Sequence, residues 1–157
     1  MAVSHPPFQR FLDAHREDVW RFLVASVGRD AADDCFQETF LAAMRAYPRM
    51  RPDNPRAWVL TIAHRKALDH FRARRRRAVP VGDLPEAPAP DADLELRDDG
   101  VWERVHALPP KQRAAVLLRF AGDLTHAEVA IVMGTSEEAA RRNAFEGLRK
   151  LRQEMTA

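Results

Sequence analysis

The stretch from Pro55 to Arg77 places the strongest constraint on what this chain can fold into. It begins with a proline, which suits the first position of a helix, and it ends in four consecutive arginines. Between these ends, apolar residues recur at the spacing of a buried helix face: Trp58, Val59, Leu60, Ile62, Ala63, Ala67, Leu68 and Phe71. The stretch therefore predicts a helix that packs along its length and meets negative charge, a phosphate backbone being the commonest candidate, at its basic end.

The composition predicts an all-α fold. Hydrophobic residues make up 46% of the 157 residues and charged residues 31%, as in a folded, soluble, charge-rich protein. There are only six glycines. β-Branched residues are sparse beside Ala, Leu and Arg, so helix propensity prevails everywhere outside the middle of the chain.

Two blocks of opposite charge follow one another in the middle of the chain. Residues 65–77 hold seven Lys/Arg and one acid, whereas residues 78–100 hold seven Asp/Glu and one base. The second block is also rich in Pro and Ala and has no apolar stripe, which predicts a flexible linker. A segment that occupies a basic channel or masks the arginines is the alternative, although composition alone favours the tether. The predicted division is a first domain at 1–77, a linker at 78–100 and a second domain at 101–157.

The first domain is expected to contain three helices. The first starts near Phe8 and ends at Gly28, and the second has a predominantly polar face that contains one leucine, Leu41. The predicted buried stripe of the second helix is Phe36, Thr39, Phe40, Ala43, Met44 and Tyr47. Prolines between Tyr47 and Pro55 predict a loop, and Asn54 is expected to cap the third helix, the one from Pro55 to Arg77.

The second domain is expected to end in a helix-turn-helix. A short helix from Val101 stops at Pro109, and the next, Lys111 to Phe120, is predicted to bury Val116, Leu117 and Phe120. Thr125 and Glu128 form a capping-box pattern, and Gly134 is expected to end that helix in a left-handed conformation. The last helix runs from Glu137 to about Glu154, with a predicted buried face of Ala140, Ala144, Leu148 and Leu151. Gly147 within it predicts a close approach to a neighbouring helix.

The outward face of that last helix carries the residue types that read duplex DNA. Those outward positions hold Glu137, Glu138, Arg141, Arg142 and Phe145, with Arg149, Lys150 and Arg152 further along. Helical hairpins with a solvated basic face are common in proteins that bind no DNA, and the pattern alone favours DNA binding only slightly.

Other patterns argue for a cytoplasmic protein without catalytic machinery. The single cysteine, Cys35, excludes an internal disulfide framework and a multi-cysteine zinc site. No run has the length of a membrane span, and the N-terminus lacks the pattern of a signal peptide. The six histidines are scattered, with no zinc-protease motif, no hydrolase triad order and no phosphate-binding loop. We therefore expect no enzymatic activity, no cofactor, no metal and no membrane insertion.

Three stretches resemble the extracytoplasmic-function (group IV) sigma factors of bacterial RNA polymerase. ADDCFQETFLAAMRAY is similar to the family's D-D-x-x-Q-E-T-F-x-x-x-W/Y-R helix, and PRAWVLTIAHRKALDHFRARRRR to its P-x-x-W-L-x-x-I-A stretch. The segment from Leu108 to Arg152 resembles the family's second domain, L-P-x-x-x-R-x-V with a following G-x-S-x-x-E-I-A-x-x-L-G. The motifs in this order are far more specific than any one alone.

The resemblance implies a role for three groups of residues. It implies that core polymerase is bound by Asp33, Asp34, Gln37, Glu38 and Leu41. It implies that the minus-ten promoter element is bound by Arg49, Arg51, Asn54, His64, Arg65, Lys66, Arg72, Arg75 and Arg76. It implies that the minus-thirty-five element is bound by Glu138, Arg141, Arg142, Phe145, Arg149 and Lys150.

The resemblance also implies an anti-sigma factor as a partner, besides core RNA polymerase and promoter DNA. The chain departs from the family pattern in two places: Arg65 stands where the family often has Asn, and the usual small, polar run of the last helix is replaced by Glu137-Glu138-Ala139-Ala140-Arg141-Arg142-Asn143. Capping of the helix is the expected role of these two acids. The alternative function is a stand-alone helix-turn-helix regulator that does not need polymerase, which leaves the acidic face of the second helix unexplained.

Overall fold

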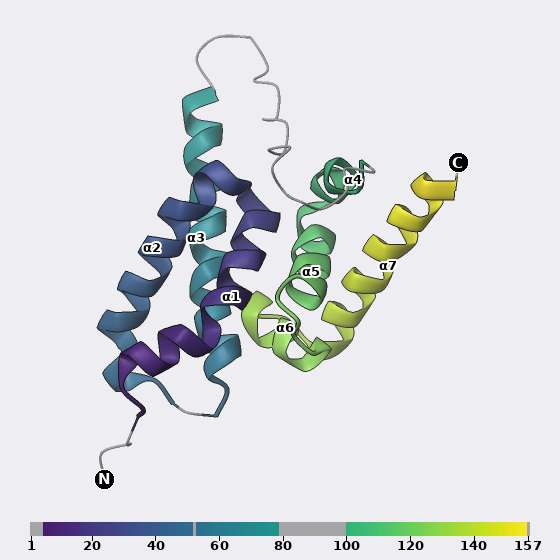
Figure 1. Ribbon diagram of the computed structural model, residues 1–157. Helices are drawn as coiled ribbons and strands as arrows, with labels where there is room; N and C mark the ends of the chain where they lie inside the picture. The colour runs from purple at the N-terminus through teal and green to yellow at the C-terminus, as the bar shows by residue number, and fades with distance from the viewer. Residues whose placement is uncertain (1–4, 52, 79–99, 157) are drawn as a thin grey trace.

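The computed structural model describes residues 5–51, 53–78 and 100–156, and every regular element within them is helical. The first unit contains α1 (Phe8–Val27), α2 (Arg29–Ala46), the short 3-10 helix η1 (Tyr47–Arg49) and α3 (Pro55–Ala78). The second unit contains α4 (Val101–Ala107), α5 (Pro110–Phe120), α6 (His126–Met133) and α7 (Glu137–Thr156) (Figure 1). The all-α prediction is confirmed, and the predicted linker, apart from Ala78 and Gly100, lies outside the described residues.

Local chemistry defines the ends of the helices in the first unit. Gly28, with a φ of 85°, separates α1 from α2. The Oδ1 atom of Asn54 accepts a hydrogen bond from the backbone N–H of Ala57 at 3.1 Å, so Asn54 caps α3 as predicted. Where a loop was expected after α2, the chain first makes the single 3-10 turn of η1, which buries Tyr47.

The predicted helix-turn-helix is present in the second unit. The Thr125 hydroxyl accepts from the Glu128 N–H at 3.2 Å, and the Glu128 carboxylate accepts from the Thr125 N–H at 2.9 Å. Gly134 ends α6 with a φ of 65°, and the Ser136 hydroxyl accepts from the Ala139 N–H at 3.1 Å at the start of α7. These contacts confirm the capping box and the left-handed helix end, and the Ser136 hydroxyl caps α7.

Two burial predictions are wrong. Met44 is 50% exposed and Phe120 is 55% exposed. Each lies at the edge of an apolar stripe whose buried places are taken by neighbours, Ala43 in α2 and Leu118 in α5. Phe120 is also the last residue of its helix and has the guanidinium of Arg119 above its ring, at 5.7 Å.

The two units pack against each other, which the sequence did not indicate. Helix α6 lies against α3, and α5 lies against α1 (Figure 1). Leu60 of α3 is fully buried, and a Cβ at Gly122 would lie 3.4 Å from its Cδ1 atom. None of the described helices is both long enough and apolar enough to cross a lipid bilayer.

Candidate partner and nucleic-acid interfaces

The outer face of α2 combines carboxylates with exposed apolar side chains. Asp33, Asp34, Gln37 and Glu38 are all exposed, and Leu41 beside them is 49% exposed. Met44, one helical turn after Leu41, is exposed to the same degree and extends the apolar area. An apolar centre within a polar rim is the usual anatomy of a protein interface. Sequence reasoning missed Met44, although its spacing of three from Leu41 was a usable signal.

The negative charges of these carboxylates affect the pKa values of neighbouring residues. The pKa of the Cys35 thiol is raised to about 11, mainly by burial and then by the negative charges of Glu38 and Asp34. The pKa of His70 in α3 is lowered, mainly by burial and then by the charges of Arg74 and Arg77. The charges of Asp34 and Glu38 act on it in the opposite direction. The acidic face of α2 therefore borders the C-terminal half of α3, and Cys35 stays a protonated thiol at neutral pH.

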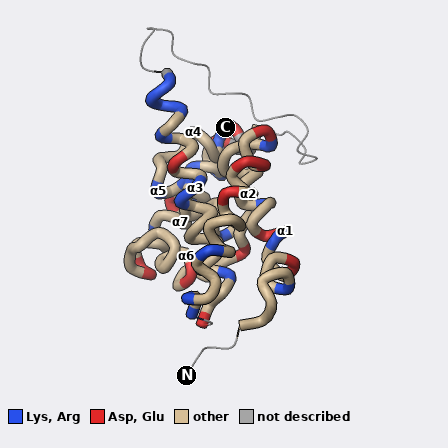
Figure 2. Tube along the Cα trace, turned by 90° about the vertical axis from the view of Figure 1, so that its left-hand side faces the viewer, with Lys and Arg blue, Asp and Glu red and all other residues tan. Residues whose placement is uncertain are grey.

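Three of the residues predicted to bind the minus-ten element form an exposed basic row on α3. Arg65, Arg72 and Arg76 are exposed, and their spacing of seven and four places them on one side of the helix. Arg72 lies 3.8 Å from Asp69, an ion pair between largely exposed side chains. Basic residues are concentrated towards the C-terminal end of α3 (Figure 2).

The other α3 residues in that set lie elsewhere. His64 is partly buried beside the ring of Phe22. Its pKa is lowered to about 4, mainly by burial and then by the charge of Arg65. It is therefore neutral at pH 7 and adds no charge to a DNA site. Arg75 is exposed as well, and it lies near enough to the second unit for its charge to add to burial, the larger cause, in lowering the pKa of Arg113. Lys66 is partly buried on the side that faces α2.

The residues of the loop before α3 that were predicted to bind the minus-ten element also differ in their surroundings. Arg49 and Arg51 are exposed on either side of Met50, which is buried. The start of the loop is held by Tyr47, whose hydroxyl donates to the carbonyl oxygen of Pro6. Asn54 instead makes a contact with the second unit, since its Nδ2 atom donates to Glu128 at 2.9 Å.

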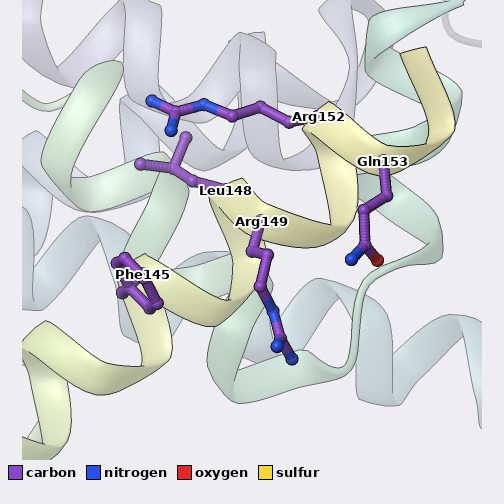
Figure 3. Close-up of a pocket in the computed structure, with 5 residues that line it drawn as sticks. All are labelled: Phe145, Leu148, Arg149, Arg152 and Gln153. Atoms are coloured by element: carbon purple, nitrogen blue, oxygen red, sulfur yellow. The ribbon is translucent and has the colours of Figure 1, made fainter. Parts of the chain in front are cut away.

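Helix α7 presents an arginine-rich face. Glu138, Arg141, Arg142, Phe145 and Arg149 are exposed, with Phe145 at 66%. Arg141 pairs with Glu137 one turn earlier at 3.1 Å. Phe145, Leu148, Arg149, Arg152 and Gln153 line a shallow surface pocket further along the helix (Figure 3). Lys150 is partly buried, and its helical position separates it from the others.

Comparisons with known proteins identify the family. The model described as Sigma-70 region 2 matches residues 11–77, and the one described as Sigma-70, region 4 matches residues 99–151. The factor SigD of Mycobacterium tuberculosis, an ECF RNA polymerase sigma factor, is 34% identical over 100% of this chain and 81% of its own length. This chain belongs to the extracytoplasmic-function sigma factors. The ECF sigma factor BldN of Streptomyces coelicolor is 34% identical over 92% of this chain, but only 58% of its own length is covered.

The fold of this sigma factor is also that of a solved relative. The sigma factor RpoE from Bartonella quintana, crystallised in complex with the anti-sigma factor NepR, superimposes with a TM-score of 0.76 at 22% identity. The match covers 95% of this chain and 96% of that chain. Family membership favours the polymerase-dependent function over the stand-alone regulator, because it accounts for the α2 face that the regulator leaves unexplained.

Proposed function

We propose that this sigma factor is a transcription initiation factor that binds core RNA polymerase and directs it to specific promoters. The observation that carries the proposal is that one chain presents two exposed faces of opposite chemistry. The α2 face is apolar and acidic, and the α7 face is basic. The first suits a protein partner with basic side chains, and the second suits DNA.

In this proposal α2 binds polymerase through Leu41 and Met44, with the surrounding carboxylates fixing the orientation. Two exposed apolar side chains supply area that becomes buried on binding, at about 25 cal/mol per Å². The charges of Asp34 and Glu38 select a basic partner and speed up the encounter more than they add affinity.

Promoter contact is assigned to α3 and α7. The row of Arg65, Arg72 and Arg76 follows the phosphates of the melted minus-ten strand, because single strands are held by cationic surfaces. On α7, Arg141 and Arg142 stand near the N-terminus, where a reading helix meets base edges. Phe145 offers an apolar contact of the kind made with a thymine methyl group. Arg149, one turn further, is assigned to a phosphate.

The remaining parts of the proposal follow from the family. The promoter-melting domain spans residues 1–77 and the minus-thirty-five domain residues 101–157. The protein acts in the cytoplasm, has no catalytic activity of its own and is held inactive by an anti-sigma factor, as the relative in complex with NepR suggests.

The experiment that tests the function is transcription in vitro with core polymerase on fragments of the host genome. The wild-type chain is expected to give discrete transcripts that core polymerase alone does not give, and these also identify the promoter. The variant Asp34→Lys/Glu38→Lys is expected to lose polymerase association. Its control is Asp13→Lys/Glu17→Lys, which reverses two exposed charges at the same spacing on α1. Equal activity of the two variants would contradict the assignment of α2.

A further inference from the structure

A cluster of aromatic rings joins the beginning of α1 to the loop before α3. In Figure 1 the chain enters α1 beside the loop that connects α2 to α3. The centre of the cluster is Tyr47, the first residue of η1, which is only 8% exposed. Its ring centroid lies 5.3 Å from that of Phe8 and 5.2 Å from that of Phe11, within the range of favourable aromatic pairs. Two rings of α1 therefore hold the start of the loop.

The residues before α1 add a polar anchor to this cluster. The Tyr47 hydroxyl donates to the carbonyl oxygen of Pro6, and the ring of His5 lies 5.1 Å from the Tyr47 ring. We call His5, Pro6 and Pro7 the N-terminal strap. Its two successive prolines restrict the backbone, so the strap loses little conformational entropy when it docks on Tyr47.

The same cluster reaches the other end of the loop. The ring of Phe11 lies 5.6 Å from that of Trp58, in an edge-to-face arrangement. Trp58 belongs to the first turn of α3, where its backbone N–H donates to the carbonyl oxygen of Asn54 at 3.0 Å. One group of rings therefore fixes the loop both where it begins, at Tyr47, and where it ends.

Near the first of these anchors the chain exposes two arginines. Arg49 and Arg51 are exposed, whereas Met50 between them is 4% exposed and donates its backbone N–H to the carbonyl oxygen of Tyr47 at 3.0 Å. Because Met50 is held inward, the arginines on either side of it point outward. Among the residues that the structure describes, no carboxylate forms an ion pair with either guanidinium. Both cations are thus available for phosphate.

We propose that the N-terminal strap, acting through Tyr47, positions Arg49 and Arg51 for the single strand of the melted minus-ten element. The proposal rests on the proposed function, in which the first unit binds that strand. The family resemblance assigned the two arginines to the minus-ten element but gave no role to Tyr47 or to the strap. A loop that is already ordered avoids the cost of becoming ordered on binding, and it therefore binds more tightly. Tyr47 is a positioning residue, because its side chain is buried against the strap and α1.

Tyr47→Phe tests the role of the hydroxyl in the complex with core polymerase. The probe is a fluorescein-labelled, single-stranded 20-mer with the minus-ten sequence of the promoter that transcription recovers. Each complex is formed at a saturating concentration of sigma factor. Tyr47→Phe is expected to bind this strand about 3 to 10 times more weakly than the wild type, because it leaves the Pro6 carbonyl without its donor. The matched control is Thr39→Val, which removes a buried hydroxyl that donates to the carbonyl oxygen of Cys35 at 2.7 Å, and it should bind normally.

A double-mutant cycle separates positioning from general stability. In an Arg49→Ala/Arg51→Ala background, Tyr47→Phe is expected to weaken strand binding no further, because the groups that it positions are absent. A loss of stability alone would weaken binding by the same factor in both backgrounds, and that result would overturn the proposal. If the wild-type complex failed to bind the strand, the proposed function would fall together with this proposal. Normal binding by the wild type and by Tyr47→Phe would overturn this proposal alone.

A second variant loosens the strap without removing any group that Tyr47 contacts. Pro6→Gly/Pro7→Gly keeps the backbone carbonyl that accepts from the hydroxyl but frees the backbone, and it is expected to weaken strand binding about 2- to 5-fold. The control is Pro109→Gly/Pro110→Gly, which changes two exposed, successive prolines at the start of α5 and should leave strand binding unchanged. Equal strand affinities of the two variants would show that the strap has no role in positioning.

Discussion

His64 illustrates how a single buried side chain links pH to stability. Its pKa is about 4 in the folded chain, against 6.5 for the free side chain, with burial as the main cause. Because the unfolded chain takes up the proton first, folding is favoured above pH 6.5 and this contribution is lost as the pH falls towards 4.

His64→Gln is therefore expected to reduce the acid sensitivity of the fold. Between pH 7 and pH 5 the shift of His64 alone lowers the free energy of unfolding by about 2 kcal/mol. Urea unfolding at the two pH values measures this loss, which should be smaller in the variant by about that amount. The same loss in both proteins would assign the acid sensitivity to His15, His70 and His106, whose pKa values are also lowered.

Gly147 has a steric role that overrides helix propensity. A Cβ at this position would lie 2.7 Å from Cγ2 of Val116, a β-branched side chain that cannot turn away easily. Gly147→Ala is expected to destabilise the second unit by about 1–3 kcal/mol, although alanine is the better helix former. In the background of Val116→Ala the same change should destabilise far less, and chemical unfolding of the four proteins compares them. An equal penalty in both backgrounds would rule out Val116 as the cause.

Much of the residue-scale structure was predictable because it depends on local chemistry. The capping box of Thr125 and Glu128, the turn at Gly134 and the cap by Asn54 each involve residues within four positions of one another. The exposure of Met44 and Phe120 was not predictable in this way. A periodic pattern identifies a stripe but does not reveal how far the neighbouring helix extends over its edge.

At the scale of the element, α2 offers an apolar pair on an acidic helix. Leu41→Ser and Met44→Ser are each expected to weaken the association with core polymerase, by about 1–2 kcal/mol, because each removes exposed apolar area that becomes buried in the complex. Ile131→Ser is the matched control, since Ile131 is a 61% exposed apolar residue on α6. Competition against a labelled sigma factor measures the affinities, and an equal effect of Ile131→Ser would remove the special role of α2.

Substitutions at two arginines of α7 distinguish contacts with bases from contacts with phosphates. If Arg142 contacts a base, Arg142→Ala is expected to cost about 1–3 kcal/mol in duplex binding and to relax the preference at one position. If Arg149 contacts a phosphate, Arg149→Ala should weaken binding to all sequences and reduce the slope of log K against log salt by about 0.9. Titrations of the recovered promoter and of single-base variants at several salt concentrations distinguish these outcomes. Uniform loss in Arg142→Ala would reassign it to the backbone.

At the scale of the whole molecule, sequence reasoning found the two units but not their contact. Arg56 donates to the carbonyl oxygen of Asp123 at 2.8 Å and lies 3.0 Å from its carboxylate, but the two residues are 67 positions apart and neither belongs to a periodic pattern. An arginine near a helix start and an aspartate in a turn are ordinary surface residues until the fold brings them together. The family resemblance did not reveal the contact either, because it assigned Asn54 to DNA and gave Arg56 no role.

The contact between the units predicts that they unfold together. In a Trp102→Phe background the remaining tryptophans, Trp20 and Trp58, both belong to the first unit, so their fluorescence reports that unit while far-ultraviolet circular dichroism reports both. The two signals are expected to coincide during denaturation of the otherwise wild-type chain. Arg56→Ala removes hydrogen bonds and ion pairs from a partly exposed guanidinium, a loss of about 1–3 kcal/mol in coupling.

Arg56→Ala is accordingly expected to separate the two denaturation curves, because each unit then unfolds at its own midpoint. Arg10→Ala, which removes an exposed arginine from α1, is the control and should keep the curves together. If the curves of Arg56→Ala still coincide, the buried contact of Leu60 with the Gly122 turn is sufficient to couple the units, and the polar bonds of Arg56 determine only their orientation.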